Sequence, residues 1–205
     1  MMDALAVHET YFWREIDQLR AVVNVVVPHL VRRGAPSLKI WSVPCSTGEE
    51  PLTLAMLLSE AGWFARFPIE VVASDGSPDA IAHARAGEYG QRSFRSLPEA
   101  MKEKYFVPSG NKWRIAPDLQ RHVSYDVVNL VAEEEVRRHA SAPIIVCRNV
   151  FIYFSEDSIQ RTLRVFERAM PAPGYLCVGA SESLLRRTVA FELQDVGGAF
   201  MYVRD

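Results

Sequence analysis

The sequence is poor in the features that mark membrane proteins and nucleic-acid-binding proteins. No apolar run approaches the roughly 20 residues that span a bilayer, and the N-terminus lacks a signal-peptide pattern. We therefore expect a cytoplasmic protein that is not inserted in the membrane. A net charge of -2 and a pI near 6.2 argue against the basic face that binds nucleic acid, so no nucleic-acid partner is expected.

Cysteine is scarce as well. The chain has three, Cys45, Cys147 and Cys177, each in or at the end of an apolar run and without metal-ligand spacing. We expect buried thiols and no metal site, although Cys45 and Cys147 could approach each other at strand ends. The sequence also contains no internal repeat, no low-complexity segment and nothing that resembles a linker between two cores.

The sequence does contain the alternation of strands and helices that is typical of one α/β domain, here residues 1–205. With 49% hydrophobic residues, the chain can bury a full core. Strands are predicted at 38–44, 69–74, 143–148 and 174–180, and a hairpin with a Gly-Gly turn at 192–203. Helices are predicted at 15–33 with a kink at Pro28, at 49–62, at 77–87, and from a cap at Ser155 to about 170.

The segment 88–130 interrupts this alternation. Turn-forming prolines and glycines surround two short β-like runs, 104–107 and 113–115. We predict a small hairpin subdomain inserted in the main sheet. Insertions on α/β folds often serve recognition, but a surface excursion without a function would have the same sequence pattern.

The segment 41–51, WSVPCSTGEEP, predicts a buried strand, a turn that ends at Gly48, and the start of a helix. This is the geometry of a nucleotide-binding loop. Glu49 and Glu50 stand where a phosphate would bind, and two carboxylates would repel it. S-adenosylmethionine (SAM) has no phosphate and carries a cationic sulfonium and an ammonium group, so it fits better than NAD or ATP. The alternative is that both glutamates only cap an exposed helix.

Asp75 ends the second predicted strand, a little over twenty residues after the glycine turn. A carboxylate at this position can accept hydrogen bonds from both ribose hydroxyls of a bound adenosine. Ser77 follows as a predicted helix cap, so Asp75 could instead be a turn or cap residue.

Seven motifs occur in order along the chain, and together they resemble the CheR family, the SAM-dependent glutamate methyltransferases of bacterial chemotaxis receptors. They are HETYFWR (8–14), WSVPCSTGEEP (41–51), ASD (73–75), ARAGEY (84–89), VNL (128–130), CRNVFIYF (147–154) and GASES (179–183). The resemblance implies a Rossmann-like methyltransferase fold, doubly wound around a mostly parallel seven-stranded sheet, with a small inserted β-subdomain that docks receptors in some members.

The resemblance also implies roles for individual residues. Cofactor contacts are implied at His8, Thr10, Arg14, Glu50, Asp75, Asn129, Leu130, Arg148 and Asn149, and catalytic roles at Arg14 and Tyr153. Three of these have plain structural alternatives: Arg148 could pair with a carboxylate at a helix end, Asn129 could be a turn residue, and Tyr153 could lie in the core.

The residue types suit methylation of a glutamate. A carboxylate is already a nucleophile at neutral pH, so it needs alignment and removal of water rather than a strong base. We hypothesise that Arg14 holds one carboxylate oxygen while Tyr153 donates to the other. No Asn-Pro-Pro-Tyr element follows the strand at 143–148, and this absence argues against methylation of a nucleobase amine.

Two departures from the family pattern bear on function. The family usually has asparagine where His8 stands, and common members begin with a helical domain that precedes the first motif and helps to seat the receptor. SAM binding is therefore expected more firmly than methylation of glutamates on the cytoplasmic helices of chemoreceptors or on another protein. The alternatives are a non-catalytic SAM-binding or partner-binding module and a methyltransferase of small carboxylic acids.

Overall fold

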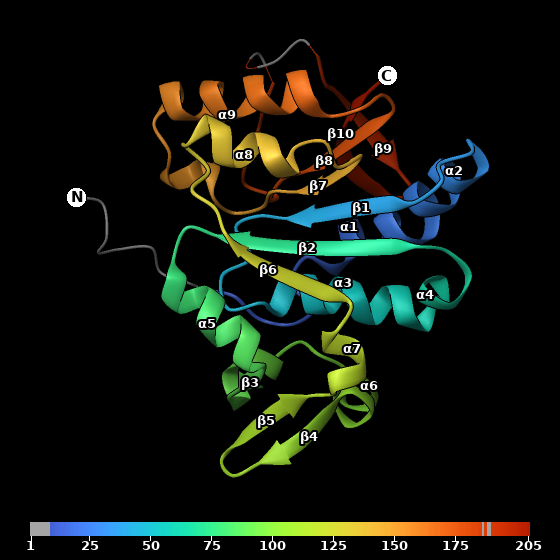
Figure 1. Cartoon of the computed structure of the whole chain (residues 1–205), viewed down its shortest axis with the longest axis vertical. Coiled ribbons are helices and arrows are strands. Elements are labelled where there is room, and N and C mark those ends of the chain that lie inside the picture. The colour runs from blue at the N-terminus through green and yellow to red at the C-terminus, as the bar shows by residue number, and fades with distance from the viewer. Residues whose placement is uncertain (1–8, 186, 188–189) are drawn as a thin grey trace.

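A seven-stranded sheet forms the centre of the computed structural model, which describes residues 9–185, 187 and 190–205 (Figure 1). Its strands are β1 (Leu38–Ser42), β2 (Ile69–Asp75), β6 (Val123–Val127), β7 (Ile144–Val146), β8 (Gly174–Cys177), β9 (Glu192–Val196) and β10 (Ala199–Arg204). They lie in the order β6-β2-β1-β7-β8-β10-β9. Neighbours from β6 to β8 are parallel, and β10 is antiparallel to β8 and β9, so the predicted doubly wound, mostly parallel sheet is confirmed.

The order of the strands reverses at β1, because β2 lies on one side of it and β7 on the other. In open α/β sheets, ligands bind beyond the carboxyl ends of the strands at this point. The fold therefore predicts a ligand-binding site in the loops that follow β1, β2, β7 and β8.

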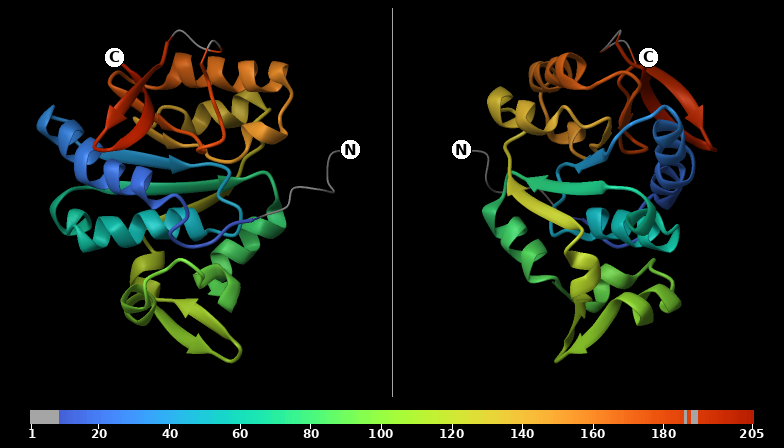
Figure 2. Two further views of the ribbon diagram at one scale, coloured as in Figure 1. Left: turned by 180° about the vertical axis from the view of Figure 1, so that it is seen from behind. Right: turned by 45° about the vertical axis from the view of Figure 1, so that its right-hand side comes forward.

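The two faces of the sheet pack against separate cores, because alternate strand residues point to opposite faces. Ile40 and Val71 belong to one core, and Trp41 and Val72 belong to the other. Figures 1 and 2 show helices on both faces. The first core includes residues of α3 (Glu49–Glu60) and α5 (Pro78–Ala86), and the second includes residues of α8 (Glu133–His139) and α9 (Glu156–Ala169).

The predicted helix boundaries hold where a cap was recognised. The Ser77 hydroxyl accepts a hydrogen bond from Ala80 N at 3.3 Å, and the Ser155 hydroxyl accepts one from Ser158 N at 3.2 Å. Gly87 ends α5 in the left-handed conformation, with φ of 63°. The predicted helix 49–62 ends earlier, at Glu60, and a short helix α4 (Trp63–Arg66) follows it.

The helix predicted at 15–33 has a different internal geometry. It begins as α1 (Ile16–Ala21), widens to a π-helical segment at Val22–Val26, and ends as α2 (Val27–Arg32). Pro28 lacks an N–H and its ring crowds the carbonyl four residues earlier, so the regular α-helical ladder cannot run through it. The wider turns lie directly before Pro28 and replace the simple kink that we predicted.

The inserted region is shorter than predicted. A second sheet, in the order β3-β5-β4, contains β3 (Glu88–Tyr89), β4 (Phe106–Ser109) and β5 (Lys112–Ile115), and helices α6 (Glu99–Tyr105) and α7 (Pro117–Gln120) flank the β4–β5 hairpin. Two expectations need correction. Residues 104 and 105 end α6 rather than starting a strand, and β6, which lies within 88–130, belongs to the main sheet because Val123 pairs with Val71 of β2.

Aromatic side chains join this second sheet to the rest of the molecule. The ring of Phe12 lies 4.8 Å from that of Tyr89, 5.4 Å from that of Phe94 and 5.0 Å from that of Phe106. All four rings belong to the larger of the two cores. The inserted region is therefore packed on the main domain and has no separate core of its own.

The three cysteines are buried and free, as predicted. Burial is the main reason that the pKa of each thiol is raised, for Cys177 to about 12. The thiols are therefore protonated at neutral pH and poorly nucleophilic. None of the helices in the described ranges has the length and apolar character that crossing a membrane requires.

Candidate active site

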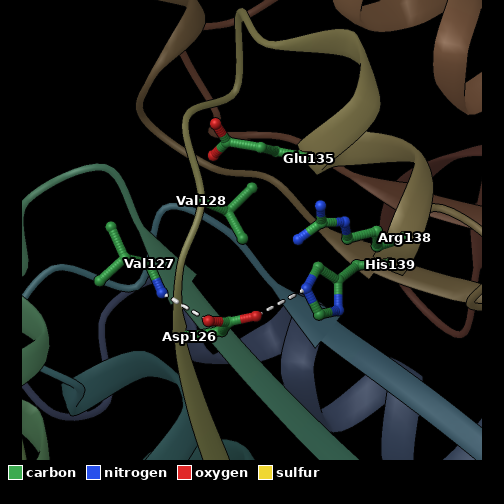
Figure 3. A pocket seen from close by; sticks show the side chains of 6 residues that line it. All are labelled: Asp126, Val127, Val128, Glu135, Arg138 and His139. Atoms are coloured by element: carbon green, nitrogen blue, oxygen red, sulfur yellow. Dashed lines mark hydrogen bonds and ion pairs between the residues drawn. The ribbon is translucent and has the colours of Figure 1, made fainter.

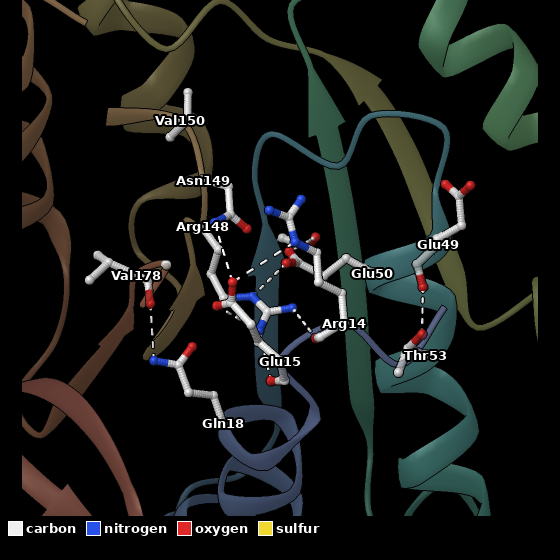
Figure 4. Close-up of polar contacts among 12 residues, drawn as sticks. Arg14, Glu15, Gln18, Glu49, Glu50, Thr53, Arg148, Asn149, Val150 and Val178 are labelled. Atoms are coloured by element: carbon white, nitrogen blue, oxygen red, sulfur yellow. Dashed lines mark hydrogen bonds and ion pairs between the residues drawn. The ribbon is translucent and has the colours of Figure 1, made fainter. Parts of the chain in front are cut away.

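Strained backbone is concentrated at the carboxyl edge of the main sheet. Four residues other than glycine have positive φ in the described part of the chain: Trp13 (71°), Glu15 (46°), Ser46 (49°) and Asn149 (60°). They lie in the segment before α1, in the loop after β1 and in the loop after β7, which meet at this edge (Figure 4). Such backbone costs of order 1–3 kcal/mol per residue and is typical of functional sites.

Gly48 shapes the loop after β1. Its φ is 97°, and its N–H donates to the carbonyl of Cys45 at 2.9 Å, which closes the turn before α3. A Cβ at this position would lie 2.9 Å from the Cβ of Ala84 and 3.0 Å from the hydroxyl oxygen of Tyr89. Glycine is therefore required here both by its conformation and by the space available.

Asp75 holds this loop against the end of β2. Its Oδ2 accepts a hydrogen bond from Ser46 N at 2.8 Å, and its Oδ1 accepts one from Ser77 N at 2.9 Å. The residue is 5% exposed. Each carboxylate oxygen has a second lone pair, so Asp75 can still accept from a ribose. The predicted ribose contact stays a prediction, and the turn role that was its alternative is present.

Glu49 is not an exposed capping residue, because it is buried at the start of α3. Its Oε2 accepts from the Thr47 hydroxyl at 2.6 Å and its Oε1 from the Ser93 hydroxyl at 2.9 Å. The hydroxyl of Tyr89 donates to the carbonyl of Thr47 at 2.9 Å. The inserted region, which contributes Tyr89 and Ser93, therefore fixes the loop after β1.

Glu50 and Arg148 form an ion pair between the first turn of α3 and the loop after β7, in which Arg148 is buried and Glu50 is 15% exposed (Figure 4). Arg148 Nε donates to Glu50 Oε2 at 2.8 Å, and the Ser42 hydroxyl donates to Glu50 Oε1 at 2.8 Å. Burial by itself would lower the pKa of Arg148, but Glu50 and then Glu15 outweigh it and the pKa is raised. Arg148 is therefore a permanent cation.

The other nitrogens of Arg148 hold the segment before α1. Nη1 donates to the carbonyl of Glu15 at 2.9 Å and Nη2 to the carbonyl of Arg14 at 3.0 Å. The side chain is 1% exposed. Of the two expectations for this residue, the structure bears out pairing with a carboxylate at a helix end; the predicted cofactor contact of Arg148 stays a prediction.

Glu15 was not recognised from the sequence, although it follows Arg14 directly. Its Oε2 accepts from Ala180 N at 3.2 Å, and its Oε1 accepts from the Asn149 side-chain amide at 3.4 Å. Arg14 Nε lies 3.9 Å from Oε1. Glu15 thus connects the loops after β7 and β8 to the N-terminal segment. Its place directly after the HETYFWR motif (8–14) is the one sequence feature that could have indicated it.

Glu182 is the second residue that sequence reasoning missed, although it lies in the GASES motif. Its carboxylate is buried and accepts hydrogen bonds from five backbone N–H groups in the loops after β7 and β8. The carboxyl edge of the sheet is therefore held by two hydrogen-bond networks, one around Arg148 and one around Glu182.

Arg14 and Tyr153, the predicted catalytic residues, are accessible. The Arg14 side chain is 27% exposed, and its Nη1 donates to the carbonyl of Glu9. Tyr153 is 51% exposed and belongs to a one-turn 3-10 helix, Phe151–Tyr153. Within the described residues, no side chain or carbonyl is bonded to its hydroxyl. The alternative that Tyr153 lies in the core is wrong, whereas its catalytic role stays a prediction.

Asn129 and Leu130 lie beside Asp75, because Val128 N donates to the carbonyl of Asp75 at 3.0 Å. Asn129 is exposed, and its Oδ1 accepts from Val131 N at 3.1 Å, as in a turn. Leu130 is buried. The structure therefore places this pair next to the predicted ribose position and gives Asn129 the turn role that was its alternative.

The first motif is only partly described. Thr10 is half-buried at the start of the described chain, and no side-chain contact of it bears on its predicted cofactor role. His8 lies outside the described residues. The predicted cofactor contact of His8, which stands where the family usually has asparagine, therefore stays a prediction.

A hollow of about 350 Å³ lies beside Asn129, between β6 and α8 (Figure 3). Its walls include Asp126, Glu135, Arg138 and His139. His139 Nε2 lies 3.2 Å from Asp126 Oδ2. Burial, and then Lys39, lower the pKa of His139 although Asp126 opposes this, so the imidazole favours its neutral form. Neither Arg14 nor Tyr153 lines the hollow.

The charge balance of the site favours a cationic ligand. Five carboxylates gather at the carboxyl edge, those of Glu15, Glu49, Glu50, Asp75 and Glu182, against the two guanidinium groups of Arg14 and Arg148. A pyrophosphate would be repelled there, whereas a sulfonium and an ammonium group would be attracted. The residues present therefore fit SAM.

Comparison with known proteins gives the same assignment. The family model described as CheR methyltransferase, SAM binding domain, matches residues 8–197. Chemotaxis protein methyltransferase 2 of Vibrio cholerae serotype O1 is 34% identical over 198 residues, which cover 95% of this chain and 68% of that protein. The probable biofilm formation methyltransferase WspC of Pseudomonas putida is 32% identical over 205 residues, which are 100% of this chain but 48% of that protein.

Among solved structures, the magnesium protoporphyrin IX methyltransferase of Synechocystis PCC 6803 with bound SAM is similar with a TM-score of 0.46 and 15% identity, over 93% of this chain and 81% of that one. A likeness at this level says nothing about the substrate. The family model, in contrast, matches nearly the whole chain. The chain therefore belongs to the CheR methyltransferase family, a family of SAM-dependent methyltransferases, and residues 8–197 match its SAM-binding domain.

Proposed function

We propose that this chain is a cytoplasmic protein-glutamate O-methyltransferase that acts on glutamate side chains in the cytoplasmic helices of chemoreceptors. The names of the V. cholerae and other relatives support the chemotaxis assignment. Because the chain spans 68% and 48% of the two relatives described above, the activity and partners of whole relatives come to it only as proposals.

The observation that carries the proposal is the pair of accessible polar groups at the switch point of the sheet. Arg14 is held there because Arg148 donates a hydrogen bond to its carbonyl. Tyr153 lies in the segment after β7, and none of the described residues is hydrogen-bonded to its hydroxyl. A guanidinium and a phenol are the groups that can hold the two oxygens of a carboxylate. In this proposal they receive the substrate glutamate.

The reaction needs no proton transfer. Bound SAM would supply an electrophilic methyl group: the carboxylate oxygen would bond to the methyl carbon as the bond from that carbon to sulfur breaks, and the sulfonium would become the neutral thioether of S-adenosylhomocysteine. Arg14 holds one oxygen of the glutamate, and Tyr153 donates to the same carboxylate so that a lone pair faces the methyl group. Aligning the two reactants in this way removes much of the entropic barrier.

A methyl-transfer assay tests the proposal. Wild-type protein, radiolabelled SAM and cytoplasmic receptor fragments are expected to give labelled receptor whose label is released as methanol by base, which is the signature of an ester. A receptor fragment with its acceptor glutamates changed to alanine is the control. Base-stable label, or label on the control fragment, would contradict transfer to glutamate side chains.

A non-catalytic SAM-binding module is the second candidate. It is favoured by the internal use of several residues with expected cofactor roles, since Glu50 and Arg148 bind each other and Asn129 closes a turn. Calorimetry separates the candidates. Binding of S-adenosylhomocysteine without any turnover on receptor fragments would support the module, whereas turnover would exclude it.

A further inference from the structure

Glu182 is a buried carboxylate whose partners are backbone N–H groups and not a cation. It is 9% exposed, and among the described ion pairs no Lys, Arg or His lies within salt-bridge distance of it. Its Oε1 accepts from Val150 N at 2.7 Å, Phe151 N at 2.6 Å and Ile152 N at 3.4 Å. Its Oε2 accepts from Asn149 N at 2.8 Å and Gly179 N at 2.7 Å.

Four of these five donors are consecutive and belong to the segment that leads into the 3-10 turn Phe151–Tyr153. The first N–H groups of any helix have no partner within the helix, so a carboxylate placed there satisfies them. The turn itself has few internal bonds: Tyr153 N donates to Val150 O at 3.0 Å and Phe154 N to Phe151 O at 3.1 Å. Glu182 therefore provides most of the hydrogen bonds that hold the start of the turn that carries Tyr153.

The loop after β8 is shaped to bring this carboxylate into position. A Cβ on Gly179 would lie 2.5 Å from the side-chain nitrogen of Asn149 and 2.9 Å from Glu182 Oε2. Glycine is therefore the residue that lets the two loops approach. Glu182 N also donates to the carbonyl of Gly179 at 2.9 Å, which closes the turn around the carboxylate.

We propose that Glu182 is a positioning residue for methyl transfer: its carboxylate holds the 3-10 turn that carries Tyr153, and so sets where the Tyr153 hydroxyl meets the substrate. The inference rests on the proposed function, because it acts through the role of Tyr153. Glu182 itself is buried and touches no substrate. Glutamine cannot replace it, since the amide NH2 would face N–H donors that need an acceptor.

A double-mutant cycle on turnover tests this. Glu182→Gln is expected to lower kcat by about tenfold or more, since misplacement of a reacting group by about 1 Å can cost 100-fold, while KM for the receptor fragment changes less. In a Tyr153→Phe background the same substitution should have little further effect, because the hydroxyl that it positions is already gone. Radiolabel with enzyme in excess measures the residual turnover.

Equal fold losses in the two backgrounds would overturn the proposal, because a general structural defect lowers turnover whether or not the Tyr153 hydroxyl is present. Unchanged turnover in Glu182→Gln would overturn it as well. Glu192→Gln is the matched control, since Glu192 is exposed on β9 at the far edge of the sheet. It should match the wild type in both backgrounds.

If Glu182→Gln does not fold, as thermal unfolding would show, the cycle is run with Gly179→Ala, which keeps the carboxylate but pushes on it and on Asn149. Equal fold losses of turnover in the two backgrounds, or unchanged turnover, would again overturn the role of Glu182. Failure of the proposed function would give a different result, because the wild type would then bind S-adenosylhomocysteine but methylate no receptor fragment.

Discussion

The two halves of the carboxyl edge are built in different ways. On the β1–β2 side, Asp75 joins two loops by bonds to Ser46 N and Ser77 N, and the glycine turn precedes it by a fixed spacing. On the β7–β8 side, Arg148 reaches groups that are far away in sequence, because it binds Glu50 and the carbonyl of Glu15, which are 98 and 133 residues distant.

The carboxylates of the edge are held in two ways, and both halves use the first of them. Asp75 and Glu182 are held by backbone N–H groups, whereas Glu50 is held by a guanidinium. Backbone donors belong to the loops themselves and fix their course, whereas the Arg148–Glu50 pair depends on two side chains, each of which can be removed by substitution. Substitutions can therefore compare what the two kinds of interaction contribute.

Loss of Arg148 should have the largest effect on stability. Arg148→Met is expected to lower the free energy of unfolding by about 3 kcal/mol, the lower end for a buried pair, because Glu50, with 15% of its side chain exposed, would lose its cation. Urea titration measures this. Arg161→Met is the matched control, since its pair with Asp157 is exposed and should be worth about 0.5 kcal/mol.

Adding Glu50→Gln to Arg148→Met should recover part of that loss, since the unpaired charge is then removed as well. A double variant less stable than Arg148→Met alone would show that the Ser42 bond, and not the ion pair, holds Glu50.

The next largest effect should fall on turnover. Arg14→Ala and Tyr153→Phe are each expected to lower kcat by about 100-fold, as loss of one positioned donor does, while the affinity for S-adenosylhomocysteine changes less. Arg20→Ala, which removes an exposed arginine of α1, is the control. Parallel losses of turnover and affinity would reassign both residues to cofactor binding.

Asp75→Ala should weaken binding of S-adenosylhomocysteine by about 1.5–3 kcal/mol, because the ribose would lose hydrogen bonds to a charged group. Calorimetry measures the affinity. Asp79→Ala, an exposed carboxylate in the next helix, should bind like the wild type. Since Asp75 also holds Ser46 and Ser77, a loss of stability should accompany the loss of affinity, and unchanged affinity would leave only this loop-holding role.

The smallest effect should be a pH dependence from His139, at the hollow outside the site. Its pKa is lowered in the folded state from 6.5, so near that pH the unfolded chain binds more protons and stability falls as the pH drops from about 7. His139→Asn should reduce this slope in urea titrations between pH 5 and 7.5. Identical slopes would show that Asp126, 3.2 Å away, cancels the effect of burial.

Much of the fold was predictable because local patterns carry it. Apolar runs, the caps Ser77 and Ser155, and the turn at Gly197 and Gly198 placed most elements within a few residues. The inserted region was predicted less well. Its short runs have no periodicity long enough to show that residues 104 and 105 belong to a helix or that β6 pairs with β2.

For the site, the sequence by itself determined the glycine turn, the acidic residue at the end of β2 and the family motifs, because each can be recognised from a few consecutive residues. Only the tertiary structure decided that Arg148 pairs with Glu50, that Glu15 joins three loops, and that Glu182 collects five N–H groups. The physical reason is that a buried charge takes its partners from whatever the packing brings near. In a parallel sheet, the strand ends that meet at one edge come from distant parts of the chain.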